Sequence, residues 1–410
     1  MADGEINYST YTREQLSEAL SRIDRARYPL NFANLTLELG ARLAEENYSA
    51  SLIKTLQAHL TFTGTGAEYF RIWVVHALLT VLSLGVYSAW AKVRKARWFA
   101  QHTQLLGDPF DYHGQPRRIL LGRAIALSLL VAYSWSTKWS PTAGLAVVGL
   151  LLVLGPALYG AAQRFRLMNT SWRGLRFGFE APPRAVYAVG IPLVLVWTST
   201  TVWVGIGGSA KGLLAASALS AVAWPAVHAS LKSMQHERTR YGEQHFSFQP
   251  ALGAFYALYA KTAGIAFALM FVMGFLGGSI LSTVPREHAF FGGVIYGVTL
   301  VGVIYIIAGS YFLARLQRLV WSHTTFGELR FGSTIQATTL LGVVARNLLL
   351  VVVTAGLYWP FAAVAIARYR VESITIESDR PPPEIAAHKR GSATAVGDAA
   401  FDLFGLDLGW

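Results

Sequence analysis

The sequence predicts an all-α, polytopic transmembrane protein with about six full spans, two broken or re-entrant segments, short cytoplasmic β-hairpins and internal repeats. The 410 residues are 53% hydrophobic and 14% charged, with a mean hydropathy of +0.39. Soluble domains usually carry about 25% charged residues. The apolar residues gather in blocks of about twenty, the length of a membrane-crossing helix. Lysine and arginine gather at the ends of these blocks.

The distribution of cations predicts the orientation in the membrane. The expected apolar segments cover residues 70–91, 119–137, 142–163, 185–206, 212–231, 252–283, 289–313 and 338–366. Four long connecting loops hold 17 lysines and arginines, whereas three short turns hold 3. Cytoplasmic loops are rich in these residues, so the long loops and both termini are expected in the cytoplasm. The same bias accounts for the net charge of +12 without nucleic acid as a partner.

Three regions are expected along the chain. Residues 1–60 read as a small soluble helical cytoplasmic module, in which Thr12 and Gln15 match a capping box at the start of a helix. Residues 61–377 form the membrane domain. Residues 378–410 are polar and proline-rich at first and are expected to be disordered. Their end, FDLFGLDLGW, is either an interaction peptide for a protein partner or an unstructured end.

A short pattern recurs after four of the apolar blocks. HTQLLGDPFDY, NTSWRGLRFGF, RTRYGEQHFSF and HTTFGELRF each place a threonine before a glycine and an aromatic residue after it. A glycine between alternating aromatic residues indicates a tight hairpin turn. LTFTGTGAEYF resembles a partial fifth copy, so the membrane domain is expected to contain internal repeats. The hairpins are interpreted as packed cytoplasmic collars, with a binding role as the alternative.

Two apolar segments are interrupted at the same point. LLTVLSLGVYSAWAKVRKARW (78–98) and LLLVVVTAGLYWPFAAVAIARYR (348–370) superimpose without a gap when Gly85 is placed on Gly356. The cation counts put the basic end of the first segment in the cytoplasm, and the soluble module before the segment is expected there too because nothing would export it. Two ends on one side predict a hairpin that enters the bilayer and returns. The alternative is a tilted, kinked span.

The interruptions supply the predicted binding site. Interrupted segments in corresponding parts of a transporter point to its substrate site, and an intramembrane arginine is a functional hypothesis by default. The predicted substrate-binding residues are Gly85, Tyr87, Trp90, Gly356, Tyr358, Pro360, His76, Arg346 and Asn347. The leading hypothesis is permeation or transport of a small solute, including an anion. The alternative is a non-transporting membrane scaffold whose basic loops bind anionic lipid headgroups.

The residues FTGTGAEYFRIW, LLTVLSLGVYSAWAKVRKARWF and HTQLLGDPFDYHG resemble the YjgN-like family of bacterial inner-membrane proteins, a domain of unknown function. The resemblance covers roughly Leu60 to Glu377, and Leu84 to Arg94 is its most specific part. The family tends to have proline before the tryptophan of this run. Ala89 stands there in the first segment, and Pro360 keeps the proline in the second. The resemblance implies a multi-pass protein of the bacterial inner membrane and no established activity.

The sequence gives no sign of an enzyme. It contains no cysteine, no phosphate-binding Gly-Lys-Ser/Thr loop, no His-Glu-x-x-His motif and no Gly-x-Ser-x-Gly turn. No catalytic residues, metal or cofactor are therefore expected. Gly274–Gly278 and Gly293–Gly297 have the spacing of close contacts between membrane helices.

Overall fold

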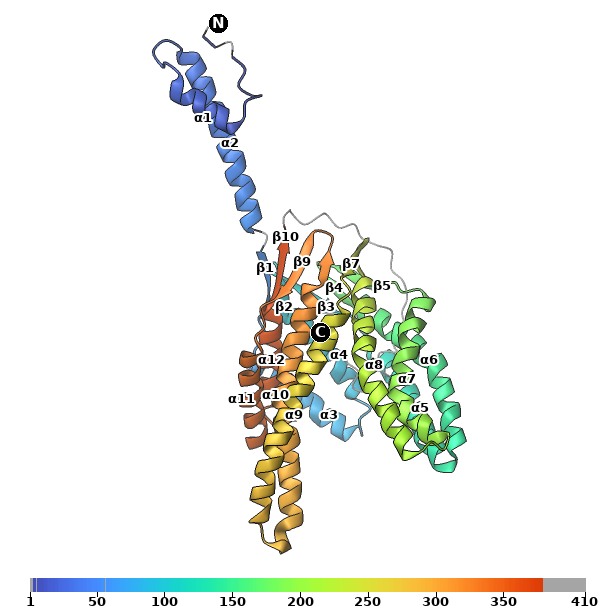
Figure 1. The fold of residues 1–410 in the computed structure, drawn as a ribbon. Coiled ribbons are helices and arrows are strands. Elements are labelled where there is room, and N and C mark those ends of the chain that lie inside the picture. Colours follow the sequence, from blue (N-terminus) through green and yellow to red (C-terminus); the bar gives the residue numbers. More distant parts are fainter. Residues whose placement is uncertain (1–2, 5, 56, 379–410) are drawn as a thin grey trace. The chain divides into compact units, whose positions relative to one another are not determined.

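The computed structural model describes residues 3–4, 6–55 and 57–378 (Figure 1). The predicted disorder and the predicted partner of the C-terminal tail fall on residues outside this range. The chain divides into two compact units, and the boundary follows Gln57. The first unit contains α1 (Arg13–Arg22) and α2 (Pro29–Thr55), which pack around Tyr8, Leu16 and Leu35.

The start of α1 shows how the first unit forms. The Thr12 hydroxyl accepts a hydrogen bond from the Gln15 backbone, and the Gln15 side chain accepts one from the Thr12 backbone. This is the predicted capping box, and it satisfies two amides that the first helical turn leaves without partners.

The second unit alternates helices with short strands. Its helices are α3 (Gly66–Leu82), α4 (Ser88–His102), α5 (Pro116–Trp139), α6 (Pro141–Met168), α7 (Pro183–Gly205), α8 (Ala210–Glu237), α9 (Leu252–Ser282), α10 (Ala289–Ser322), α11 (Ala337–Val353) and α12 (Trp359–Glu372), with the 3-10 turn η1 (Arg286–His288). Its strands are β1 (Gln57–Phe62), β2 (Thr103–Leu105), β3 (Asp108–Tyr112), β4 (Thr170–Trp172), β5 (Leu175–Phe179), β6 (Thr239–Tyr241), β7 (Gln244–Phe248), β8 (Thr324–Phe326), β9 (Leu329–Ser333) and β10 (Ile374–Ser378).

A threonine begins the first strand of each of the four hairpins and ties it to the preceding helix. Its hydroxyl donates to the backbone carbonyl four residues earlier, where the last helical turn lacks an internal partner. The four bonds are Thr103 to Phe99 (2.9 Å), Thr170 to Arg166 (3.0 Å), Thr239 to Gln235 (2.6 Å) and Thr324 to Val320 (2.8 Å). This bond explains why the repeated sequence pattern contains threonine.

Two-residue turns close the four hairpins. In the turns Leu106–Gly107 and Arg173–Gly174 both residues have positive φ, as in type I′ turns. In the other two turns Gly242 and Gly327 alone have positive φ, as in type II′ turns. Both turn types match the twist of paired strands, so the recurring glycine is required by backbone geometry.

The ten strands form one closed antiparallel barrel, in which β1 pairs with both β2 and β10. Neighbouring hairpins also pair with each other, for example Phe177 opposite Tyr241 and Phe246 opposite Phe326. The prediction of an all-α fold is therefore wrong. An isolated two-stranded hairpin is only marginally stable, and closing the barrel removes the exposed strand edges that such hairpins would leave.

Aromatic rings converge on one face of the barrel strands. Strands two positions apart are separated by roughly 10 Å, yet rings on such strands approach far more closely, as expected on the concave side of a barrel. The pairs are Phe110 and Phe177 (6.3 Å between centroids), Tyr241 and Phe326 (6.3 Å), and Phe246 and Phe331 (5.8 Å).

Tyr241 links this aromatic interior to the backbone. Its hydroxyl donates to the carbonyl of Trp172, two strands away, at 2.8 Å. Burial raises the pKa of Tyr241, and the nearby Arg173 partly offsets this shift. The opposite face of the strands is charged, because Arg240 and His245 contact Glu180 at 2.7 and 3.5 Å.

The helices of this unit extend from one end of the barrel as antiparallel pairs (Figure 1). Among the described residues, four helical segments are long and apolar enough to cross a membrane: Ala143–Met168, Ala210–Glu237, Leu252–Ser282 and Arg286–Ser322. The prediction of six full spans is therefore wrong. The segments expected at 119–137 and 185–206 form α5 and α7, and α5 carries Arg117, Arg118 and Arg123 in its first turns.

The predicted glycine contacts between α9 and α10 are also wrong. A methyl group added at Gly274, Gly278, Gly293 or Gly297 would meet open space. Gly277 instead lies against the ring of Tyr296, whose hydroxyl donates to the carbonyl of Met273. A four-residue spacing shows that small residues share a helix face, but it does not show which face meets the neighbouring helix.

We expect Thr324→Val to destabilise the protein by about 1–3 kcal/mol, because it removes a fully buried hydroxyl bonded to Val320 and 3.0 Å from His236 Nδ1. Thermal unfolding of the purified full chain measures the effect. Thr325→Val is the matched control, since Thr325 is the next residue of the same strand and its side chain is only half-buried. An equal loss in the control would contradict the role given to the Thr324 hydroxyl.

Candidate functional site

The two interrupted segments form two short helical hairpins. In the first, α3 and α4 are joined by residues 83–87, and in the second, α11 and α12 are joined by residues 354–358. Their helices contain 17, 15, 17 and 14 residues, compared with 28 to 34 in α6, α8, α9 and α10. Each short hairpin therefore leaves the barrel, turns and returns to it.

Both hairpins turn through the same backbone motif, a Schellman cap. In the first, the Gly85 amide donates to the Thr80 carbonyl at 2.8 Å and the Leu84 amide to the Val81 carbonyl at 3.1 Å. The equivalent bonds of the second hairpin join Gly356 to Val351 (2.8 Å) and Ala355 to Val352 (3.1 Å). Leu84, Gly85, Ala355 and Gly356 have φ values of 50°, 91°, 49° and 93°.

These turns satisfy their own amides. In each turn a side-chain hydroxyl also accepts a hydrogen bond from the amide of the turn tyrosine. The Tyr87 amide donates to the Ser83 hydroxyl at 2.8 Å, and the Tyr358 amide donates to the Thr354 hydroxyl at 3.0 Å. The α7–α8 turn uses the same cap, with the Gly208 amide donating to the Trp203 carbonyl at 2.9 Å. The interruption in each short segment is thus a helix–helix turn, and its backbone needs no ligand to complete its hydrogen bonds.

The tips of the two turns are apolar and point outward. The side chain of Leu84 is 95% exposed and that of Leu357 is 58% exposed. The predicted site residues Gly85 and Gly356 lie in these tips, where an added methyl group would meet open space. Their role in the structure is conformational.

Three predicted residues of the first hairpin come together. The ring of Tyr87 stacks on His76 at 5.5 Å and on Trp90 at 6.0 Å. The Nδ1 atom of His76 is buried and has no hydrogen-bond partner. Such an atom costs free energy unless something else binds to it.

In the second hairpin, Asn347 occupies the position that corresponds to His76. Its side chain is 1% exposed, and its Nδ2 atom donates to the Val343 carbonyl at 2.7 Å. That bond fixes the orientation of the amide, so its buried Oδ1 atom is an acceptor without a partner. Arg346, the residue before it, is exposed.

Tyr358 and Pro360 lie at the start of α12. Tyr358 stacks on Phe361 at 5.1 Å, and Pro360 is buried near the first turn of the helix. Proline fits there because the first turn does not need its missing amide. Pro156 in α6 and Pro225 in α8 occupy the same place, 14 residues before the next strand, although those helices continue through it.

The helix α3 connects the two groups of predicted residues. Phe361 lies 5.7 Å from Phe70, which in turn lies 6.3 Å from Trp73 on the same helix. His76 and Tyr69 of α3 contact α4 instead, through Tyr87 and Trp98. The predicted residues are therefore grouped within each hairpin, and one helix packs against both groups.

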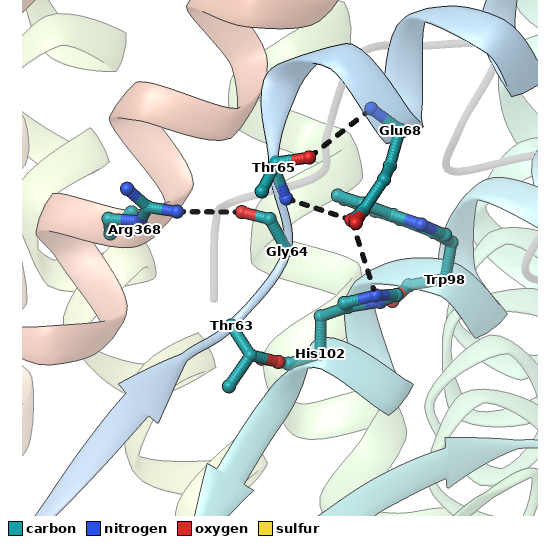
Figure 2. A network of polar contacts seen from close by, with 7 residues as sticks. All are labelled: Thr63, Gly64, Thr65, Glu68, Trp98, His102 and Arg368. Carbon is teal, nitrogen blue, oxygen red and sulfur yellow. Dashed lines mark hydrogen bonds and ion pairs between the residues drawn. The ribbon is translucent and has the colours of Figure 1, made fainter.

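A polar junction fastens the two hairpins where the barrel closes (Figure 2). The Arg368 guanidinium donates to the Gly64 carbonyl at 2.8 Å, and the Thr63 amide donates to the His102 carbonyl at 2.9 Å. Glu68 accepts from the Thr65 amide at 3.2 Å and lies 3.9 Å from His102 Nε2. A methyl group added at Gly64 would come within 2.5 Å of Trp98, so only glycine fits.

Phe70, Gly64 and Arg368 were not among the residues predicted to belong to this region. One signal was available: Trp90 superimposes on Phe361, which indicates that each hairpin carries an aromatic ring three residues after its turn tyrosine. The glycines of FTGTG were a second signal, because a close backbone contact requires them.

Among the described residues, no group of three or more His, Asp or Glu side chains is placed to hold a metal ion.

Comparison with known proteins places these features in a family. The profile of a family described as bacterial protein of unknown function, DUF898, matches residues 57–403. The chain is 22% identical to "Inner membrane protein YjgN" of Salmonella typhimurium over 349 residues, 78% of this chain and 88% of that protein. It is 30% identical to the protein of the same name from Escherichia coli O157:H7 over 135 residues, 31% of this chain and 32% of that protein. These matches confirm the resemblance seen in the sequence. No solved structure matches the chain.

We expect Gly356→Ala to destabilise the protein by about 1–2 kcal/mol, because a side chain at this φ of 93° is strained. Gly342→Ala is the matched control: it adds the same methyl group inside α11, in open space, and should be neutral or stabilising by up to about 1 kcal/mol. Thermal unfolding compares the two. If both variants unfold at the same temperature, the cap geometry is wrong.

Proposed function

The chain belongs to the DUF898 family of bacterial proteins, whose relatives include inner membrane proteins, and we propose that its two short hairpins enter the bilayer and admit a small polar solute. In this proposal the protein crosses the inner membrane several times, and its barrel and both termini lie in the cytoplasm. The long loops of the barrel side hold most of the lysines and arginines, which favours that orientation.

The lengths of the helices support a re-entrant position. A helix of 17 residues rises about 26 Å, less than the roughly 30 Å of a hydrocarbon core. A hairpin that starts and ends at the barrel therefore turns before it reaches the far side. Its exposed Leu84 and Leu357 suit a lipid environment, and its turn amides are already bonded, as a turn inside the hydrocarbon requires.

The proposal of solute transport rests on two buried polar atoms, one in each short hairpin. The corresponding residues His76 and Asn347 both have a buried polar atom without a hydrogen-bond partner. Buried polar atoms are nearly always paired, and these two lie in the two segments that do not complete a crossing. We infer that a passing solute binds to them.

The chemistry of these atoms bears on the kind of solute. Because Asn347 Nδ2 is held by the Val343 carbonyl, the free atom is an acceptor, and it favours a solute that donates O–H or N–H groups. The stacked rings beside His76 and Tyr358 supply apolar walls. This combination fits a small hydroxylated or amine-bearing compound better than an anion at this position.

A flux assay tests the proposal. Proteoliposomes with the full chain should conduct at least one solute of a panel containing glycerol, urea, methylammonium and acetate, and Asn347→Leu should reduce that flux about tenfold. Thr339→Leu, which exchanges an exposed polar side chain on the same helix, is the control and should leave the flux unchanged. Flux no greater than that of empty liposomes for every solute would sink the proposal, as would full flux through Asn347→Leu.

A second candidate function, binding of anionic lipid headgroups, is favoured by a belt of exposed cations. Each of these cations lies six to nine residues before a barrel strand, and therefore at a similar distance from the barrel along its helix. They are Arg94 and Lys95 on α4, Arg164 on α6, Arg315 and Arg318 on α10, and Arg368 on α12. Cations at the membrane surface attract anionic lipids, by about 1 kcal/mol each.

For this candidate, we expect the purified protein to retain phosphatidylglycerol over phosphatidylcholine when both are offered in mixed micelles. Replacing Arg94 and Lys95 with glutamine should lower the retained phosphatidylglycerol. Lys211→Gln should not lower it, because Lys211 lies at the start of α8, the end of that helix farther from the barrel strands. Equal retention of both lipids would exclude a headgroup site at the belt.

A further inference from the structure

A solute does not reach Asn347 unless a helix moves. The side chain of Asn347 is 1% exposed, whereas that of His76, the corresponding residue of the first hairpin, is half-buried. Binding of a solute to the Asn347 Oδ1 atom therefore requires the second hairpin, α11 and α12, or one of its neighbours to shift. The polar bonds between neighbouring helices indicate which element is free to do so.

The first hairpin is tied to its neighbour close to its tip. The Arg123 guanidinium of α5 donates to the Ser88 hydroxyl of α4 at 2.6 Å. That hydroxyl in turn donates to the Gly85 carbonyl in the turn at 2.5 Å. Through Ser88, Arg123 holds the turn of the first hairpin against α5.

Two tyrosines tie longer helices at a similar distance from the barrel. The Tyr187 hydroxyl of α7 donates to the Val153 carbonyl of α6 at 2.7 Å, and the Tyr256 hydroxyl of α9 donates to the Val222 carbonyl of α8 at 3.0 Å. Each carbonyl lies three residues before a proline of its helix, which lacks an amide and interrupts the helical hydrogen bonds. The pairs α4–α5, α6–α7 and α8–α9 are thus all joined by a polar bond.

The second hairpin has no bond of this kind among the described residues. From residue 337 to residue 367, its side-chain hydrogen bonds stay within the hairpin. The side chains of Asn347 and Thr354 donate to backbone carbonyls of α11, and the Thr354 hydroxyl accepts from the Tyr358 amide. Its contacts with other helices in this stretch are apolar: Phe361 meets Phe70 of α3, and Leu340 packs with Ala314 of α10.

This difference matters in a membrane. Lipid tails are as apolar as leucine, so apolar contacts between membrane helices have no hydrophobic driving force, and hydrogen bonds distinguish a held helix from a free one. The base of the second hairpin is held, because Arg368 donates to the Gly64 carbonyl at 2.8 Å and Arg370 Nε donates to Gln317 Oε1 at 2.9 Å. A shift of the hairpin would therefore pivot at the barrel and be largest at the tip.

We propose that the second hairpin is the gate of the solute path: it pivots at its base to expose Asn347, while Arg123 holds the first hairpin in place. The role as a gate rests on the proposed transport, but the movement itself does not. Arg123 is a positioning residue here, because it acts on the turn of the first hairpin through Ser88.

Hydrogen–deuterium exchange of the full chain in lipid nanodiscs tests the movement. After correction for intrinsic rates, the amides of residues 348–358 should exchange about fivefold faster than those of the corresponding residues 77–87, the effect of about one hydrogen bond between membrane helices. Arg123→Leu should speed exchange at 77–87 and leave 348–358 unchanged. Ser88→Ala gives a second reading if that variant does not fold. Arg117→Leu, at an exposed arginine in the first turn of α5, is the matched control and should alter neither segment.

The exchange pattern can overturn the proposal in two ways. One is a second tip that exchanges no faster than the first in the wild type. The other is an Arg123→Leu variant that leaves the first tip unchanged or speeds both tips equally.

A designed disulfide tests the gate itself, since the chain contains no cysteine. A methyl group added at Gly66 would lie 3.2 Å from the Phe361 Cα atom, which suits a bridge in the double variant Gly66→Cys, Phe361→Cys. In the proteoliposome assay, the oxidised double variant should conduct about tenfold less than the same protein after reduction. Equal flux in both states would overturn the gate and leave the transport proposal intact. Absence of flux in the wild type would sink transport instead, and the exchange measurement alone would then decide whether the second hairpin is the mobile element.

Discussion

Pairing of the first barrel strand with the last is the constraint on which the second unit depends. Each hairpin has strands of three and five residues, too short to be stable alone. Only when β10 pairs with β1 does every strand gain two neighbours. The same closure brings α12 against α3, where Arg368 reaches the Gly64 carbonyl and Phe361 meets Phe70. The two short hairpins are neighbours because the barrel closes between them.

The helix-to-strand junctions show how local chemistry repeats around this ring. A threonine hydroxyl bonds to the last helical turn, and a positive-φ glycine turns the strand back. Arginines six residues before a strand also recur: Arg97 donates to the carbonyl of the last residue of β3, and Arg318 and Arg368 donate to carbonyls two residues beyond the ends of β9 and β1. These bonds tie the last turns of α4, α10 and α12 to the ends of neighbouring strands.

Much of the local structure was predictable, because it rests on residues close together in the chain. The Thr–Gly–aromatic pattern predicted each hairpin, and the alignment of Gly85 with Gly356 predicted two matching interruptions. Closure was not predictable, since it joins residues 57–62 to residues 374–378 and leaves no local signal. The burial of Asn347 was equally hidden, because its orientation depends on the packing of α11 against its neighbours rather than on helical spacing.

The closed barrel also constrains the order of events during synthesis. β1 is made early, and the partner that completes it follows more than 300 residues later. Until then the growing chain carries two unpaired edges, and such edges readily join strands of other molecules. Synthesis of β10, rather than insertion of any one helix, is therefore the step that completes the ring. A deletion of residues 374–378 alone should therefore be as damaging as the loss of a whole helix.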